Sequence, residues 1–296
     1  MTTGPPAEPF DRRANRSPKN AIRIPTLFRI AHDGGVTDQP GLEGRVALIT
    51  GVGRRAGIGY AVARRLLGLG ATVVAHAWTP YDVSAWNASP NEADAVLEEL
   101  KELGEVEQVQ ADFSDSDAPA AVLEAARARF GHVDILVVNH TRSGGGSLAE
   151  LTPEGLDDFL HENVRASLLL VKEFAAQHDG RPGGRVVLMT SGQHISPMRD
   201  EVPYAVSKGA LHQATLTLSD ALIERGITVN TINPGPTDTG WGLGDIDPAD
   251  SMPQGRWGQP DDAARLIAWL CTDEAQWITG QVFDSEGGFR RWALRR

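Results

Sequence analysis

From Arg45 onward, short apolar runs alternate with longer stretches rich in alanine and leucine, and this alternation constrains the fold more than any other feature. The first run, residues 46–49, is apolar throughout, which is typical of a strand buried on both faces. Repeated strand–helix units of this length imply parallel strands joined by right-handed crossovers. We therefore predict an α/β fold in a single domain, with a doubly wound parallel sheet that carries helices on both faces.

The same pattern locates the individual elements. The expected strands are residues 46–49, 71–77, 106–111, 133–138, 185–190, 227–232 and 281–284. The expected helices are residues 58–69, 92–103, 118–130, 156–177, 205–224 and 263–271, the fourth being one long helix or two that abut. Ligands of such sheets bind beyond the carboxyl ends of the strands, near the switch in strand order, so functional residues are expected at that edge.

Composition excludes several classes of protein. The chain has 28 Lys and Arg against 39 Asp and Glu, a net charge of −11, whereas nucleic-acid binding by phosphate neutralisation needs the opposite sign. The sequence has no apolar run near the ~20 residues that cross a bilayer, so no membrane partner is expected. Cys271 is the only cysteine, which excludes an intramolecular disulfide and fits a reducing, cytoplasmic location.

The N-terminal segment differs from the rest of the chain. Prolines and a Gly34-Gly35 pair break any helical or strand period, and the segment lacks the apolar core of a secretory signal. We expect residues 1–42 to be a partly mobile N-terminal extension and residues 43–296 to be the catalytic domain. The alternative is a start codon assigned too far upstream.

A glycine-rich segment, residues 50–59, follows the first expected strand and leads directly into a helix. A strand, a tight glycine turn and a helix N-terminus together form an anion site, in which backbone N–H groups face a pyrophosphate. The alternative is a purely structural turn, since the chain has 32 glycines. The cofactor-binding residues expected from this Rossmann-like loop are Gly51, Gly53, Arg54, Arg55, Gly57, Ile58 and Gly59.

The end of the second strand distinguishes between the two pyridine dinucleotides. NAD sites usually place an acid there for the ribose hydroxyls, whereas this chain ends the strand on Trp78, and its first acid is Asp82. The lack of an acid, with Arg54 and Arg55 in the loop, favours NADP(H) over NAD. The alternative is that both arginines are solvated. Trp78 is expected to border the cofactor.

A tyrosine and a lysine, Tyr204 and Lys208, stand at i and i+4 near the start of an expected helix. This spacing places them on one face, where a cation favours the phenolate and lowers the pKa of a tyrosine. Such a phenol serves as a general acid or base. Ser191 follows the fifth strand, and Asn139 ends the fourth, both at the ligand-binding edge. Asn163 interrupts a helical pattern that asparagine does not favour.

With these motifs the chain resembles the short-chain dehydrogenase/reductase family, in its compact one-domain branch, over residues 44–288. The most specific element is Ser191, followed thirteen positions later by Tyr204-x-x-x-Lys208. Asn163 and the glycine loop stand upstream in the family's order. Residues 233–237 resemble the family's nicotinamide segment, and residues 285–288 resemble its closing turn.

The resemblance implies a role for each residue. Ser191 would hydrogen-bond the carbonyl oxygen of a substrate and Tyr204 would protonate it. Lys208 would lower the tyrosine pKa and hold the nicotinamide ribose, and Asn163 would anchor a water of a proton relay. Asp112 resembles the family's adenine contact, although helix capping explains it equally well. The remaining cofactor-binding residues expected are Phe113, Asn139, Pro234, Gly235 and Thr237.

Two departures from the family pattern stand out. Five residues separate Gly51 from Gly57 where the family has three, unless Gly53 takes the place of the first glycine. After the fourth strand, the family's Asn-Ala-Gly run is replaced by Asn139-His140-Thr141, so larger side chains border the nicotinamide. Gly57 and Gly59 keep their places in either alignment.

The resemblance implies an NAD(P)-dependent oxidoreductase that acts on a small carbonyl or secondary alcohol, with no metal. A 3-oxoacyl-carrier-protein reductase or another ketone reductase fits, and the alternatives are an NAD-dependent alcohol dehydrogenase and a non-catalytic dinucleotide-sensing regulator. Residues 143–147, 194–199 and 241–257 are expected to line the pocket mouth, the last as a mobile lid. The family also implies a homotetramer or dimer, with the helices around Asn163 and Tyr204 between subunits.

Overall fold

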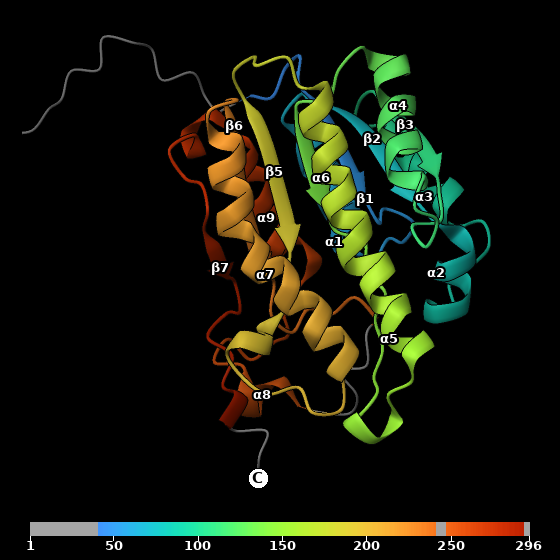
Figure 1. Cartoon of the computed structure of the whole chain (residues 1–296), viewed down its shortest axis with the longest axis vertical. Coiled ribbons are helices and arrows are strands. Elements are labelled where there is room, and N and C mark those ends of the chain that lie inside the picture. Colours follow the sequence, from blue (N-terminus) through green and yellow to red (C-terminus); the bar gives the residue numbers. More distant parts are fainter. Residues whose placement is uncertain (1–40, 241–246, 293–296) are drawn as a thin grey trace, which may run out of the picture. The chain divides into compact units, whose positions relative to one another are not determined.

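The computed structural model describes residues 41–240 and 247–292, in which seven strands form one parallel sheet (Figure 1). The strand order is β3-β2-β1-β4-β5-β6-β7, and all neighbouring strands run parallel. The strands are β1 (Val46–Thr50), β2 (Thr72–Ala77), β3 (Val106–Gln110), β4 (Ile135–Val138), β5 (Gly184–Met189), β6 (Ile227–Asn233) and β7 (Val282–Asp284). The order switches between β1 and β4, which confirms the predicted doubly wound α/β fold.

Helices cover both faces of the sheet. One face carries α1 (Ile58–Gly68), α3 (Glu92–Lys101) and α9 (Pro260–Cys271). The other carries α4 (Ala118–Phe130), α6 (Ala166–Gln177) and α7 (Val202–Ile223). Shorter helices lie at the ends of the strands: α2 (Thr79–Trp86), α5 (Pro153–Phe159) and α8 (Pro248–Ser251).

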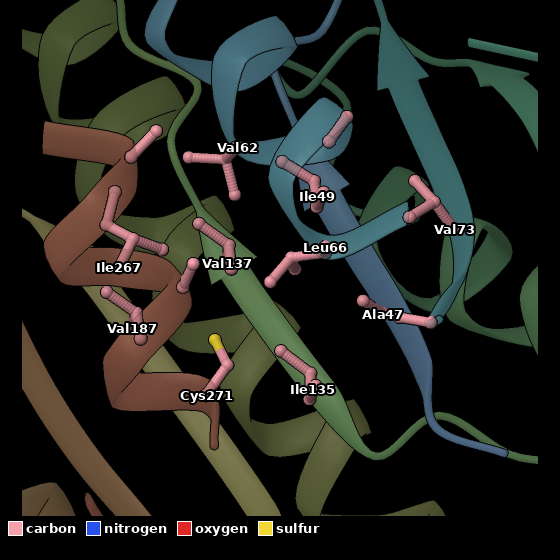
Figure 2. Close-up of a cluster of buried hydrophobic side chains, with 14 of the residues drawn as sticks. Ala47, Ile49, Val62, Leu66, Val73, Ile135, Val137, Val187, Ile267 and Cys271 are labelled. Carbon is pink, nitrogen blue, oxygen red and sulfur yellow. The ribbon is translucent and has the colours of Figure 1, made fainter. Parts of the chain in front are cut away.

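The core consists of two apolar layers, because successive strand residues point to opposite faces of the sheet. Ala47 and Ile49 of β1 point to the α1 and α9 side, where Cys271 is also buried (Figure 2). Val46 and Leu48 point to the α4 and α6 side. Both faces of the central strands are therefore buried, which explains their continuous apolar sequences.

The segment predicted as one long helix or two abutting helices over 156–177 consists of α5 and α6, joined by a π-helical turn at Leu160–Arg165. Two other elements differ from the prediction. Helix α7 begins at Val202, so Tyr204 lies in its first turn. Helix α2 was not predicted. Its Pro80 lies in the first turn, a position that suits proline, but none of its residues is fully buried, so it lacks an apolar stripe.

The predicted N-terminal extension lies outside the described residues, apart from its last two. Of these, Leu42 is 3% exposed and packs in the core on the α1 side. Within the described part of the chain, no helix has the length and apolar character needed to span a membrane.

Candidate active site

A cavity of about 580 Å³ lies at the carboxyl edge of the sheet. Its wall is formed by the glycine loop, the segments after β2, β4, β5 and β6, and the first two turns of α7. This position is the switch point at which open α/β sheets bind ligands, and the volume is in the range of small-molecule sites.

The glycine loop turns sharply between β1 and α1. Gly51 adopts a φ of +75°, which favours glycine, and a Cβ there would lie 2.9 Å from the Asn139 amide nitrogen. A Cβ at Gly59 would overlap the carbonyl oxygen of Gly51. These two glycines therefore allow the start of α1 to pack against the end of β1. Of the two alignments of the loop, this geometry favours the one that begins at Gly51.

The N-terminus of α1 faces the cavity. Gly57 is its N-cap, no side chain caps the first turn, and that turn has no acidic residue. Gly57 and Ile58 line the cavity. Uncapped N–H groups at the positive end of a helix bind phosphate, so the residues present fit the diphosphate of a dinucleotide.

Asn139 connects the ends of β4 and β1. Its amide nitrogen donates to the carbonyl oxygens of Thr50 and Gly51 at 3.0 and 3.1 Å. The next residue, His140, packs on Phe113 with the two ring centres 4.4 Å apart. Its Nδ1 is hydrogen-bonded to Thr50 Oγ1 at 2.8 Å. Burial lowers the pKa of His140 to about 3. His140 is therefore a neutral, tightly packed side chain at the border of the cavity.

Ser191 and Tyr204 meet on the cavity wall. Ser191 precedes the short 3-10 helix Gly192–His194, and its side chain makes no capping hydrogen bond there. Burial raises the pKa of Tyr204 to about 12, and the neighbouring Ser191 hydroxyl opposes this rise. The phenol is therefore protonated at neutral pH.

Lys208 lies one helical turn after Tyr204, on the same face of α7. Its Nζ is 5.7 Å from the centre of the Tyr204 ring and donates to the Met189 carbonyl oxygen at 3.1 Å. The side chain is 2% exposed, and burial lowers its pKa to about 7. Burial raises the pKa of Tyr204 in this structure, and the lowering of that pKa by Lys208 stays a prediction.

Asn163 lies in the π-helical turn and is buried. Its amide oxygen accepts from Arg142 N at 2.6 Å and from Thr141 Oγ1, while its amide nitrogen donates to Ser207 Oγ at 2.9 Å and to the Arg142 carbonyl oxygen. Protein groups therefore use the amide's full hydrogen-bonding capacity. These hydrogen bonds connect the segment after β4 to α7. The role of Asn163 in binding a water of a proton relay stays a prediction.

The segment after β6 forms another part of the cavity wall. Pro234, Gly235 and Thr237 all line the cavity. Gly235 has a φ of +68°, and a Cβ there would lie 2.8 Å from Glu286 Cα. Close packing against the C-terminal segment thus requires glycine at this position.

Some predicted cofactor residues lie outside the wall. Arg55 pairs with Glu99 at the surface, where its Nε donates at 2.7 Å. Asp112 accepts from Ser114 N in a local turn, and Phe113 stacks on His76 at 4.1 Å. The structure brings together instead the predicted residues Gly51, Arg54, Gly57, Ile58, Trp78, Asn139, Ser191, Tyr204, Lys208, Pro234, Gly235 and Thr237.

Two groups of residues in the cavity wall were not predicted from the sequence. Helix α2 contributes Tyr81, Asp82 and Trp86, and its only sequence signal was Pro80. The C-terminal segment contributes Glu286, Phe289 and Arg291, with Arg291 paired to Glu286. Of the predicted lid, Trp241 and residues 242–246 lie outside the described residues, while Trp257 lines the cavity. Within residues 41–240 and 247–292, no cluster of side chains is suited to hold a metal ion.

Comparison with known proteins agrees with this geometry. A family model described as Enoyl-(Acyl carrier protein) reductase matches residues 51–290. A short-chain dehydrogenase/reductase from Serratia marcescens is 33% identical, with a TM-score of 0.75 over 85% of this chain and 99% of its own. The chain belongs to the short-chain dehydrogenase/reductase family. As a member, it is an NAD(P)-dependent oxidoreductase that acts on CH–OH or C=O groups.

Two further relatives of this short-chain dehydrogenase/reductase are informative. The uncharacterized oxidoreductase YjdA of Bacillus subtilis is 37% identical over 252 residues, 83% of this chain and 97% of the relative. The angucycline C-6 ketoreductase LanV, solved with bound NADP, is 32% identical, with a TM-score of 0.73 over 84% of this chain and 96% of its own.

Proposed function

We propose that this protein is an NADP(H)-dependent ketone reductase, which transfers hydride between the nicotinamide and a carbonyl or secondary alcohol substrate. One observation carries the proposal. Ser191, Tyr204 and Lys208 lie on the wall of the same cavity as the uncapped N-terminus of α1. The dinucleotide site and the proton donor thus share one cavity.

The described residues fit a pyridine dinucleotide. Gly57 and Ile58 would bind its diphosphate, and Lys208, which is buried with a single protein acceptor in the described chain, would donate to a ribose hydroxyl. Asn139, Gly235 and Thr237 would border the nicotinamide half. When bound, the cofactor supplies the hydride.

The side chains around the reacting oxygen provide the rest of the chemistry. Ser191 donates a hydrogen bond to the carbonyl oxygen and stabilises the negative charge that grows there. Tyr204 holds its proton at neutral pH, since burial raises its pKa, and transfers it to that oxygen. A protonated phenol is the state that the reduction of a ketone requires.

The substrate class is proposed as a neutral ketone. Met198, Trp257 and Phe289 line the cavity with apolar side chains, and Arg291 is paired with Glu286. The relative LanV, named as an angucycline ketoreductase, supports ketone reduction. A 3-oxoacyl thioester on a carrier protein is another member of the same class. We also propose a homo-oligomer in the cytoplasm, and light scattering tests the oligomeric state.

A second candidate is an NAD-dependent alcohol dehydrogenase. The observation in its favour is Asp82, whose carboxylate lies in the cavity wall although it does not end β2. An acid in this region suits the ribose hydroxyls of NAD.

The proposal is tested with a panel of ketones, 3-oxoacyl thioesters and alcohols, read as the change in NADPH absorbance. We expect at least one ketone to oxidise NADPH in a reaction that Tyr204→Phe abolishes. Dinucleotide binding without turnover of any ketone or alcohol would support the sensing regulator instead. Affinity for NAD(H) at least tenfold higher than for NADP(H) would select the dehydrogenase.

A further inference from the structure

The described cavity wall contains two phenols, and the proposed chemistry uses only one of them. Of the three tyrosines in the chain, Tyr81 and Tyr204 line the cavity, whereas Tyr60 does not. Tyr81 lies in the first turn of α2 and is half-buried. A half-buried phenol on a cavity wall is a hydrogen-bonding group available to a ligand.

The Tyr81 hydroxyl is held in place by the segment after β4. Its oxygen accepts a hydrogen bond from Ser143 N at 2.9 Å. Because the oxygen is the acceptor in this bond, the phenolic proton remains available for donation. Within residues 41–240 and 247–292, no protein acceptor is hydrogen-bonded to this proton. A donor withdrawn from water without a partner is costly, so the wall favours a ligand that presents an acceptor to Tyr81.

Backbone contacts connect Tyr81 to the part of the wall that carries Tyr204. The segment after β4, which bonds Tyr81, also pairs with the start of α7. Gly146 N donates to the Asp200 carbonyl oxygen at 2.8 Å, and the Gly146 carbonyl oxygen accepts from Val202 N at 2.9 Å. Val202 is the first residue of α7, and Tyr204 follows two positions later. One short segment therefore bridges the two phenols.

The pKa of Tyr204 reflects the same arrangement. Burial raises this pKa to about 12, and the Ser191 hydroxyl opposes the rise. Repulsion from Glu201 and from Tyr81 adds to the rise, because a Tyr204 phenolate would lie near both groups. The two phenols are therefore close enough to interact, at the place where the carbonyl oxygen is proposed to be protonated.

The charges of the wall indicate which kind of acceptor fits. Apart from Lys208, which is assigned to the cofactor ribose, the arginines of the described wall are paired with acids. Arg54 lies 3.8 Å from Asp82, and Arg291 is paired with Glu286. A carboxylate on the substrate would exchange its hydration for one neutral donor, which is unfavourable. An uncharged carbonyl, ether or hydroxyl oxygen loses less hydration and suits a phenol.

We propose that Tyr81 determines substrate specificity by donating a hydrogen bond to a second, uncharged oxygen of the ketone. The inference rests on the proposed function, because it names the substrate class of that same site. Ser191 and Tyr204 bind the carbonyl oxygen that is reduced, and Tyr81 binds an oxygen elsewhere in the molecule. The substrate class is therefore a ketone that carries a further carbonyl, ether or hydroxyl group. A ketone without this oxygen leaves the Tyr81 donor unpaired and is a poorer substrate.

The test compares methoxy-substituted cyclohexanones and acetophenones with ethyl-substituted ketones of the same shape, read as NADPH oxidation. The methoxy oxygen is an acceptor, whereas the ethyl group has none. In the wild type, we expect kcat/KM to favour at least one methoxy ketone over its ethyl counterpart by roughly three- to tenfold, the contribution of one neutral hydrogen bond. Tyr81→Phe should remove this preference while it retains the aromatic ring. The rate with the ethyl ketones shows any general effect of losing the bond to Ser143.

Tyr60→Phe is the matched control, because it removes a hydroxyl that bonds Glu99 outside the cavity and should keep the wild-type preference. NADPH affinity of Tyr81→Phe, measured by fluorescence titration, should equal that of the wild type.

Equal kcat/KM for every methoxy–ethyl pair in the wild type would overturn the inference without any variant and leave the proposed function intact. A preference that persists in Tyr81→Phe would also overturn it, and a simultaneous fall in NADPH affinity would assign Tyr81 to the cofactor instead. Absence of turnover with every ketone would remove the proposed function, and the inference with it.

Discussion

The Lys208 ammonium nitrogen lies 5.7 Å from the centre of the Tyr204 ring, one turn away on the same helix. Because both residues belong to α7, the distance depends on helix geometry and not on the surrounding loops. Burial opposes ionisation of both groups, raising the pKa of Tyr204 to about 12 and lowering that of Lys208 to about 7. The pair therefore presents a protonated phenol to the cavity.

Tyr204→Phe should reduce kcat by about a hundredfold or more, the usual contribution of an acid–base group. The ring and its packing remain, so the dissociation constant for NADPH should change little. Tyr60→Phe is the matched control, because the Tyr60 hydroxyl bonds Glu99 and does not line the cavity. A Tyr204→Phe protein with wild-type turnover would exclude the proton-transfer role.

Lys208→Ala should weaken NADPH binding and lower kcat together, because the ammonium is proposed to contact a ribose hydroxyl and stands beside Tyr204. Lys172→Ala, a change on α6 at an exposed residue, controls for loss of positive charge. Fluorescence titration and steady-state kinetics separate the two effects. A loss of rate with unchanged NADPH affinity would contradict the ribose contact.

Much of the sheet and part of the candidate site could be predicted from local sequence. Continuous apolar runs such as β4 are typical of strands buried on both faces, and the Tyr204–Lys208 spacing fixes a shared helix face. The position of the glycine loop before α1 was predicted from the order of strand, turn and helix. These predictions depend on neighbours within a few residues, which is the range over which sequence patterns are informative.

The parts that could not be predicted depend on contacts between distant segments. Helix α2 has no buried stripe, so its side chains in the cavity gave no periodic signal. Arg291 lies beside Gly192, almost a hundred positions earlier, and no local pattern indicates that contact. Likewise, Arg54 and Arg55 are equivalent in the sequence, but only Arg54 meets α2, while Arg55 pairs with Glu99.

Gly59→Ala should damage the glycine loop, because the added methyl group overlaps the carbonyl oxygen of Gly51. We expect the free energy of unfolding to fall by ~1–3 kcal/mol, as in other overpacked sites, and NADPH affinity to fall with it. Gly68→Ala on the same helix meets no atom within 4 Å and should stabilise the protein by up to about 1 kcal/mol. Urea unfolding and NADPH titration of both variants measure these effects, and equal behaviour of the two would contradict the predicted overlap.

His76 should make stability depend on pH. It is 2% exposed, stacks on Phe113 and bonds the Ala111 carbonyl oxygen through Nε2 at 3.0 Å, and burial lowers its pKa from 6.5 to about 4. The unfolded chain therefore binds more protons below pH 6.5, so the free energy of unfolding should fall as the pH drops toward 4, by up to about 3 kcal/mol from this group. Burial also lowers the pKa of His140, so this residue should likewise reduce the free energy of unfolding as the pH falls.

His76→Gln should be less stable than the wild type at pH 7.5. In urea unfolding, the difference in the free energy of unfolding between the two proteins should narrow toward pH 4.5. Parallel curves across this range would show that His76 does not remain neutral in the folded protein.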